Sequence, residues 1–316
     1  MSFSGNVKEE LSEHWTKARH CQIAELAAMI SMCGSILIDR RDHISIRMHT
    51  ENIAVARKYF TLIRKTFNIN TDVSIRSNLA KQSVSYYVVV KRHEDALKIL
   101  RATKMVGEDL FTVNHIVVQQ TCCKRAFLRG AFLAAGSMSD PNKSYHFEIV
   151  CSSEEVANQL QELMQSFSMD AKIVRRKKNY VVYLKEGSQI VDMLNIMEAH
   201  VSLMELENVR ILKDMRNAVN RKVNCETANI NKTVSAAVKQ LEDIEYIQNT
   251  VGLSTLNEGL NDIAVVRLAN PDASLKELGE LLTPPVGKSG VNHRLRKLGE
   301  IADGIRKSHG NQGGLL

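Results

Sequence analysis

Hydrophobic residues in the first 200 positions alternate between a helical spacing and a strand-like spacing. Between Thr50 and Phe67 the apolar residues recur every three or four positions, at 53, 56, 60, 63 and 67, which predicts an amphipathic helix. From Val84 to Lys91 the period changes to two, with positions 86, 88 and 90 on one face and 87 and 89 on the other. This alternation predicts a strand. We therefore expect the first 200 residues to form an α+β domain.

A nine-residue segment occurs twice in this domain. Residues 26–34 read LAAMISMCG, residues 128–136 read LRGAFLAAG, and a serine follows each copy. The last residues of the two copies, Gly34 and Gly136, are 102 positions apart. Similar segments at a constant spacing are typical of a duplicated unit. We predict two repeats with antiparallel sheets, at about residues 20–105 and 120–198, each with the order helix, two strands, helix, two strands, helix (αββαββα).

Spacing and capping residues place the individual elements. A helix at 7–16, capped by Ser4, is predicted before the first repeat. The first repeat is expected to contain a helix ending near Gly34, strands at 36–39 and 44–49, a helix capped by Thr50, strands at 72–76 and 84–91, and a helix at 94–100. The second is expected to contain a helix at 121–136, a strand at 145–151, a helix capped by Ser152 or Ser153, strands at 171–175 and 180–184, and a helix at 188–197.

Beyond residue 200 the pattern is helical throughout. Residues 201–251 contain no proline and predict a helical linker, which the polar segment 224–231 is expected to interrupt. Three short helices follow in residues 252–310, and residues 311–316 are predicted to be a disordered tail. Ser274 and Glu277 have the spacing of a capping box at the start of the second helix. The segment TPPVGKSG separates it from a basic third helix, an order typical of an all-α helix-turn-helix domain.

The third helix of this domain carries much of the positive charge. Residues 286–308 contain six cations and two acids, a net charge of +4 out of +7 for the chain. Asparagine and arginine read adenine and guanine edges in the major groove, and cations at the flanks contact phosphates. The alternative is the solvated face of an ordinary helical hairpin. The predicted DNA-binding residues are Ser274, Lys276, Lys288, Ser289, Asn292, His293, Arg294, Arg296 and Lys297.

Composition narrows the class of protein further. A net charge of +7 favours an anionic partner. The longest uncharged run, residues 26–38, is shorter than the roughly 20 residues that span a bilayer, and the N-terminus lacks the layout of a signal peptide. We therefore expect a cytoplasmic protein without membrane contact. The six cysteines lack the spacing of a zinc knuckle and are expected to be reduced thiols that mostly pack as small apolar groups. No metal and no cofactor are predicted.

The repeated segment resembles the signature of the LAGLIDADG homing endonucleases, and the order of elements resembles their two-repeat form. The resemblance implies that the two signature helices pack together through small residues, here Ala27, Ala28, Gly130, Ala131 and Ala134. It also implies an acid that holds the catalytic metal at the eighth signature position, where this sequence has Cys33 and Ala135. A thiol is a poor magnesium ligand and a methyl group is none. The nearest acids, Asp39 and Asp140, lie past the helix ends, so we expect no enzyme activity.

Basic residues on or beside the strands are candidates for auxiliary DNA contacts from the sheets. For residues 175–178 a solvated hairpin tip is an equally good interpretation. These residues are Arg47, Arg76, Arg175, Arg176, Lys177 and Lys178.

A degenerate LAGLIDADG-like domain (1–200), a linker (201–251) that includes RNAVNRKVNCETANINKTVSAA, and a C-terminal helix-turn-helix together resemble the WhiA family of bacterial regulators. The resemblance covers essentially the whole chain. It implies a nucleoid-associated regulator that binds double-stranded DNA and acts in transcription, in cell division and chromosome segregation, or in sporulation, with other regulators or RNA polymerase as further partners. An active LAGLIDADG-type endonuclease, and a nucleoid or protein-interaction module without sequence readout, are the alternatives. The sequence does not predict the oligomeric state or the DNA target.

Overall fold

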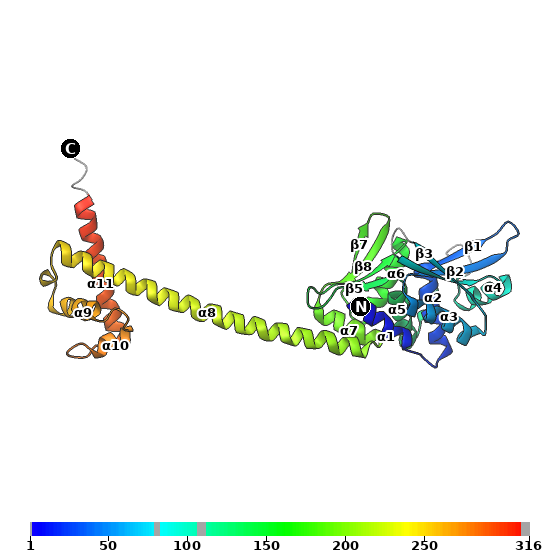
Figure 1. Ribbon diagram of the computed structural model, residues 1–316, viewed down its shortest axis with the longest axis horizontal. Coiled ribbons are helices and arrows are strands. Elements are labelled where there is room, and N and C mark those ends of the chain that lie inside the picture. Colours follow the sequence, from blue (N-terminus) through cyan, green and yellow to red (C-terminus); the bar gives the residue numbers. More distant parts are fainter. Residues whose placement is uncertain (1, 79–82, 106–111, 311–316) are drawn as a thin grey trace. The chain divides into compact units, whose positions relative to one another are not determined.

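The computed structural model describes residues 2–78, 83–105 and 112–310 and divides into two compact units, Met1–Asp214 and Met215–Leu316 (Figure 1). The predicted tail at 311–316 lies outside the described residues. The first unit combines helices with two antiparallel sheets, whereas the described part of the second is helical. The predicted α+β class and the all-α C-terminal region are thus confirmed.

Two repeats of the same topology build the first unit, after an N-terminal helix α1 (Phe3–Glu13). The first repeat consists of α2 (Arg19–Cys33), β1 (Gly34–Ile38), β2 (Ile44–Thr50), α3 (Ile53–Phe67), β3 (Asp72–Asn78), β4 (Ser83–Val90) and α4 (His93–Ala102). A short 3₁₀ helix η1 (His115–Val118) precedes the second, which consists of α5 (Thr121–Ala135), β5 (Gly136–Met138), β6 (Phe147–Cys151), α6 (Glu154–Gln165), β7 (Lys172–Arg176), β8 (Asn179–Leu184) and α7 (Gly187–Met197). The sheet orders β1-β2-β4-β3 and β5-β6-β8-β7 are equivalent, which confirms the duplicated αββαββα order.

The strand pleat separates a buried face from an outer face in each sheet. In the first sheet Met48 pairs with Val88, and both are fully buried beneath the helices. Their neighbours His49 and Tyr87 also pair and lie on the opposite face. Because successive side chains point to opposite sides, Arg47 shares the outer face with His49. The polar positions of the strands are therefore displayed away from the core.

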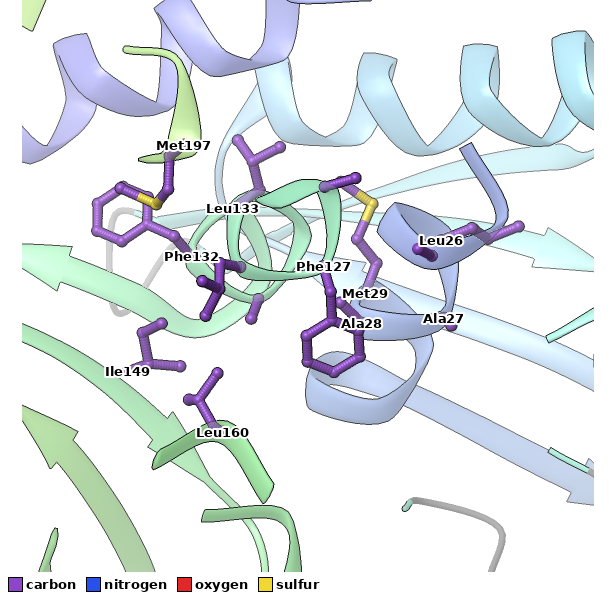
Figure 2. Close-up of a cluster of buried hydrophobic side chains, with 14 of the residues drawn as sticks. Leu26, Ala27, Ala28, Met29, Phe127, Phe132, Leu133, Ile149, Leu160 and Met197 are labelled. Carbon is purple, nitrogen blue, oxygen red and sulfur yellow. The ribbon is translucent and has the colours of Figure 1, made fainter. Parts of the chain in front are cut away.

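The two signature helices, α2 and α5, form the centre of the first unit (Figure 2). Ala27, Ala28 and Ala131 are fully buried between the repeats. A Cβ atom on Gly130 would clash with the backbone carbonyl oxygen of Glu25 and would lie 3.1 Å from the Cβ of Ala28. Only a residue without a side chain allows the two backbones to approach so closely. The predicted close approach is thus confirmed for Gly130 and Ala28, whereas Ala134, also predicted here, is only half-buried.

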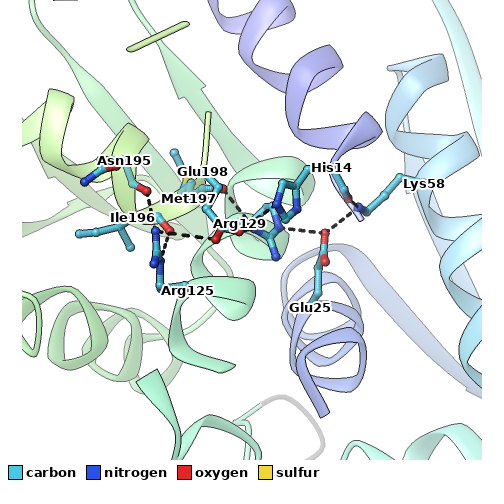
Figure 3. A network of polar contacts seen from close by, with 9 residues as sticks. All are labelled: His14, Glu25, Lys58, Arg125, Arg129, Asn195, Ile196, Met197 and Glu198. Carbon is cyan, nitrogen blue, oxygen red and sulfur yellow. Dashed lines mark hydrogen bonds and ion pairs between the residues drawn. The ribbon is translucent and has the colours of Figure 1, made fainter. Parts of the chain in front are cut away.

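A buried network of charges crosses the same helix pair (Figure 3). The Glu25 carboxylate of α2 lies 3.2 Å from Lys58 Nζ and 3.5 Å from Arg129 Nε, and all three residues are 1% exposed. Arg129 Nη1 donates to Glu198 Oε2 at 2.5 Å and to the carbonyl of Met197 at 3.2 Å. Each buried charge thus faces an opposite charge, which offsets its desolvation.

Two predicted helix starts are wrong. Helix α1 begins at Phe3 with Ser2 as its cap, because the Ser2 hydroxyl accepts from the backbone of Gly5. Ser4 instead accepts from the backbone of Met138. Helix α3 is capped by Asn52, whose side chain accepts from two backbone N–H groups, rather than by Thr50, which lies in β2. Ser153 does cap α6 as predicted. Strand β5 was not predicted as a separate strand, because three residues carry too little periodicity.

Helix α8 (His200–Thr250) is one uninterrupted helix of 51 residues. The predicted break at 224–231 is therefore wrong. This segment is exposed and polar, but it contains neither glycine nor proline, so nothing in it prevents backbone hydrogen bonding from continuing. Polarity alone does not end a helix that is held at both ends.

The second unit packs its helices around a core of its own. After α8 come a 3₁₀ turn η2 (Leu253–Thr255), α9 (Glu258–Ala269), α10 (Leu275–Glu280) and α11 (Lys288–Gly310). Its buried residues are Ile244, Ile247, Leu260, Ile263, Ala264, Leu278, Leu282, Val291, Leu295, Leu298 and Ala302.

Candidate nucleic-acid interface

The predicted capping box fixes the start of helix α10. The Ser274 hydroxyl accepts from the Glu277 backbone at 3.4 Å, and the Glu277 carboxylate accepts from the Ser274 backbone at 2.7 Å. These reciprocal bonds satisfy two N–H groups that a helix otherwise leaves free. They lower the pKa of Glu277, so the cap stays charged at neutral pH. Ser274, one of the predicted DNA-binding residues, therefore already has a structural role.

The turn between α10 and α11 depends on a close backbone approach at Gly279. The Val286 backbone N–H donates to the Gly279 carbonyl at 2.9 Å. A Cβ atom at Gly279 would clash with the carbonyl oxygen of Val286. The glycine therefore allows the turn to fold back on α10, so that α11 packs against it in the helix-turn-helix arrangement.

Helix α11 has an apolar face and a polar face. Val291, Leu295 and Leu298 are at most 3% exposed and pack into the core of the second unit. The opposite side presents six exposed residues with donors or positive charge, which we call the basic face: Lys288, Ser289, Asn292, His293, Arg296 and Lys297. The structure thus brings six of the nine predicted DNA-binding residues onto one surface in the N-terminal half of the helix.

The cations of the basic face remain available for a ligand. Arg296 lies 3.8 Å from Glu300, with both side chains at least 70% exposed. Lys276 on α10 is similarly exposed and lies 3.9 Å from Glu280. Exposed pairs of this kind contribute on the order of 1 kcal/mol or less. A phosphate or a base edge can therefore displace them at small cost.

Two other arginines of α11 have contacts within the fold. Arg294, one of the predicted DNA-binding residues, is half-buried, and its Nη1 donates to the carbonyl of Gly259 at 3.3 Å. Arg306 donates to the buried carboxylate of Asp243 at 2.7 Å and lies over the Tyr246 ring. Arg306 therefore holds α11 against α8 rather than extending the basic face.

A groove beside the basic face contains an arginine that the sequence patterns did not indicate. It has a volume of about 450 Å³ and is lined by residues that include Lys232, Gln240, Arg267, Ser274 and Asn292. Arg267 is 3% exposed; its Nη1 donates to the carbonyl of Ala273, and its Nε has no hydrogen-bond partner among the described residues. The burial of an arginine at the end of an apolar helix cannot be predicted from the spacing of residues in the sequence.

The outer faces of the two sheets differ in charge. In the first sheet the guanidinium groups of Arg76 and Arg47 lie 5.3 and 5.9 Å from the Tyr87 ring centre, and the His49 ring lies 4.9 Å from it at a tilt of 34°. In the second sheet Glu148 accepts from Arg176 at 2.8 Å and is also bonded to His146 and Ser137. A carboxylate thus neutralises part of the second face, whereas the cations of the first face are paired only with an aromatic ring among the described contacts.

The basic tip of the β7–β8 hairpin, residues 175–178, is exposed. Arg175 and Arg176 end β7, and Lys177 and Lys178 form the turn, with Lys177 at a φ of 55°. Arg175 lies 5.9 Å from the centre of the Tyr180 ring. The structure is thus consistent with either of the two interpretations given to this hairpin.

The ends of the signature helices do not fit a magnesium ion. The Cys33 thiol lies 3.1 Å from the carbonyl of Met29 and 3.0 Å from the Tyr59 hydroxyl, and burial raises its pKa to about 11. The side chain of Ala135 offers no ligand atom. The Asp39 carboxylate is exposed and accepts from the backbones of Arg41 and His43. A neutral thiol is not the hard oxygen ligand that this ion prefers.

Fold and surface together define a class: helix-turn-helix proteins that carry a duplicated LAGLIDADG-like unit. Three family models match the chain, the WhiA N-terminal LAGLIDADG-like domain over residues 19–106, the WhiA LAGLIDADG-like domain over 124–216 and the WhiA C-terminal HTH domain over 219–302. The chain belongs to the WhiA family.

Individual relatives cover nearly the whole chain. The probable cell division protein WhiA of Lachnoclostridium phytofermentans is 59% identical over 313 residues, which are 97% of this chain and 100% of that protein. The protein of the same description from Alkaliphilus oremlandii is 51% identical over 97% of this chain and 98% of its own. The crystal structure of full-length DUF199/WhiA from Thermatoga maritima is 26% identical and superimposes with a TM-score of 0.59 over 96% of this chain and 98% of that chain. None of the described helices is long and apolar enough to cross a membrane.

Proposed function

We propose that this protein is a sequence-specific regulator that binds double-stranded DNA, acts in bacterial cell division and has no enzyme activity. The basic face of α11 carries the proposal, because it combines base-reading and phosphate-binding side chains on the second helix of a helix-turn-helix motif. The description of the relatives as probable cell division proteins supports the process.

The proposal gives a separate role to each part of the basic face. The N-terminal half of α11 enters the major groove, where Asn292 reads adenine and Arg296 reads guanine by paired hydrogen bonds. Ser289 and His293 lie on the same side of the helix and contact neighbouring base edges. Lys288 and Lys297 neutralise phosphates, and Lys276 on α10 contacts the DNA backbone that α10 crosses.

Base readout is tested by selecting bound sequences from a random DNA library and comparing variants on the selected site. Arg296→Ala and Asn292→Ala should each weaken specific binding by about 1–3 kcal/mol, roughly 5- to 150-fold, and relax the preference at one base position. Lys307→Ala, an exposed cation in the last turns of the same helix, is the control. Unchanged affinity and unchanged preference in both base-reading variants would refute the assignment.

Phosphate contacts are tested through the salt dependence of binding. The logarithm of the affinity should fall linearly with the logarithm of the salt concentration. Lys297→Ala should weaken binding to all sequences equally and reduce that slope by about one unit. A slope unchanged in this variant would remove Lys297 from the phosphate contacts.

The outer face of the first sheet is a second candidate DNA surface. Among the described residues Arg47 and Arg76 contact an aromatic ring and no carboxylate, whereas Arg176 of the second sheet is paired with Glu148. This difference favours the first sheet. The double variant Arg47→Ala/Arg76→Ala should lower the salt slope more than Arg175→Ala/Arg176→Ala. Slopes equal to that of the parent protein in both double variants would leave DNA binding to the second unit alone.

The loss of nuclease activity rests on Cys33 and Ala135, which cannot hold magnesium. Incubation of the protein with supercoiled plasmid and magnesium should leave the plasmid intact. Metal-dependent nicking that remains with the protein when it is purified further would favour the alternative of an active LAGLIDADG-type endonuclease. Binding to random DNA as tight as to the selected site would favour the other alternative, a nucleoid or interaction module.

The resemblance to the family supports roles in transcription, chromosome segregation or sporulation, with other regulators or RNA polymerase as partners. Genome-wide mapping of bound sites separates these roles. Binding upstream of division genes, with changed transcripts in a deletion strain, is the outcome expected for a transcription regulator. Bound sites without any transcript change would point to a direct role on the chromosome.

A further inference from the structure

The first turns of α2 and α5 bring together four side chains that the sequence pattern did not connect: His20, Cys21, Cys122 and Cys123. One ligand atom from each lies within 4.8 Å of every other. Cys21 and Cys123 occupy equivalent positions in the two repeats, as do His20 and Cys122, because each pair is 102 positions apart. The fold that joins the signature helices therefore also gathers three thiols and an imidazole.

The spacing of these atoms is close to that of a tetrahedral metal site. His20 Nδ1 lies 3.2 Å from Cys123 Sγ, 3.4 Å from Cys21 Sγ and 4.0 Å from Cys122 Sγ. Around a zinc ion, with bonds of about 2.3 Å to sulfur and about 2.0 Å to nitrogen, the ligand atoms are on the order of 3.5–3.8 Å apart. Shifts of about an ångström or less would therefore complete the coordination.

The environment favours thiolates with a cation between them. Both helices begin here without a side-chain cap, and the N-terminus of a helix stabilises negative charge nearby. A shallow cavity of about 190 Å³, lined by His20 and Cys123 among others, gives access from solvent.

We propose that His20, Cys21, Cys122 and Cys123 bind one zinc ion, or another soft divalent ion of the same preference, as a Cys₃His structural site that clips the two repeats together. Three soft sulfur ligands and one imidazole select zinc over magnesium. Each thiol loses its proton to solvent as its sulfur–metal bond forms. The site lies about 18 Å along α2 from Cys33, so it is separate from the position at which homing endonucleases would hold a catalytic metal.

The first test measures the metal on the unaltered protein, purified under reducing conditions without chelators. Mass spectrometry of the elements should find about one zinc per chain. After zinc removal, titration with Co²⁺ should give the intense visible bands of a tetrahedral ion and a thiolate charge-transfer band that saturates at one equivalent. Neither readout depends on DNA binding, so failure here leaves the proposed function untouched.

Variants assign the ligands. Cys21→Ser and Cys123→Ser should each weaken the cobalt charge-transfer band, because one thiolate ligand is lost, and His20→Ala should change the visible bands while keeping the thiolate band. Cys225→Ser, which removes an exposed thiol on α8, is the matched control and should bind as the parent does. Circular dichroism identifies any variant that fails to fold, and His20 is exposed, so its removal leaves the core intact.

Three outcomes would overturn the proposal. The first is that the reduced, unaltered protein contains no zinc and shows no thiolate–cobalt charge-transfer band when Co²⁺ is added. The second is a spectrum unchanged by Cys21→Ser and Cys123→Ser. The third is a disulfide among Cys21, Cys122 and Cys123 that persists in the protein isolated from cells, which would make the cluster a redox pair instead.

Discussion

At the scale of single residues, Glu25 connects the two repeats electrostatically. Its carboxylate faces Lys58 of the first repeat and Arg129 of the second, and all three side chains are excluded from water. A buried ion pair contributes little compared with an apolar substitute of the same shape, but removing one partner leaves the other charge buried and uncompensated. The stability of the unit therefore depends on keeping all members of the network.

Glu25→Gln should lower the free energy of unfolding of the first unit by about 3 kcal/mol or more, since Lys58 and Arg129 lose their shared counter-charge. Urea unfolding followed by tryptophan fluorescence measures this directly. The only tryptophan, Trp15, lies with its ring centre 4.0 Å from Lys58 Nζ, beside the network. Glu51→Gln, at an exposed acid, is the control. Equal stabilities of the two variants would mean that the buried charges are not coupled.

Glu198 makes the same unit sensitive to acid. Burial opposes ionisation of its carboxyl, but the hydrogen bond from Arg129 and the nearby positive charges outweigh this effect and lower its pKa. A lowered pKa stabilises the folded state above the pKa of the unfolded chain, about 4.3, and this contribution is lost as the pH falls through the folded value. Unfolding measured from pH 7 down to pH 3 should show this loss, and Glu198→Gln should flatten the curve in that acidic window. Parallel curves for the two proteins would exclude Glu198 as the titrating group.

Some residues of the candidate interface could be predicted from the sequence and others could not. The capping box at Ser274 and the exposed side of α11 follow local spacing rules, and the structure reproduces both. The contact of Arg294 with Gly259 and the burial of Arg267 depend on how three helices pack, and no local pattern encodes that. The cluster of His20 with Cys21, Cys122 and Cys123 was missed for the same reason, since its two halves come from positions a hundred residues apart.

At the scale of elements, the contact between α2 and α5 depends on Gly130. Gly130→Ala would push a methyl group against the Glu25 carbonyl, and overpacking of this kind costs about 1–3 kcal/mol. The fluorescence of Trp15 during urea unfolding reports the loss. Gly187→Ala is the matched control in the same unit, because its new methyl group would make only ordinary contacts at 3.4 Å. A Gly130→Ala protein as stable as the control would show that the helices can separate at no cost.

Helix α8 shows why hydrophobic periodicity does not always predict where a helix ends. Periodicity detects a helix through its buried face, but the middle of α8 is exposed on all sides, so its polar stretch has no apolar stripe to detect. The absence of glycine and proline was the better indicator. The duplicated α+β order was predictable because each element there has one face in a core.

At the scale of the whole molecule, the protein has two separate cores, one for each unit. Leu295→Ala, in the core of the second unit, should lower the stability of that unit by about 2–5 kcal/mol and leave the Trp15 transition unchanged. Hydrogen exchange on peptides from 258–302 measures the first effect. Val265→Ala, at a side chain 51% exposed, should change stability by no more than about 0.5 kcal/mol. A Trp15 midpoint that shifts with Leu295→Ala would show that the two cores unfold together.

The ion pair between Glu25 and Arg129 also determines which repeat can associate with which. By the 102-residue offset, the counterpart of Glu25 in the second repeat is Phe127, and the counterpart of Arg129 in the first is Ala27. Two copies of either repeat would therefore place a charge against an apolar residue at this contact. The duplicated halves have diverged into complementary partners. A split protein made from the two repeats should accordingly assemble as a one-to-one heterodimer in preference to either homodimer.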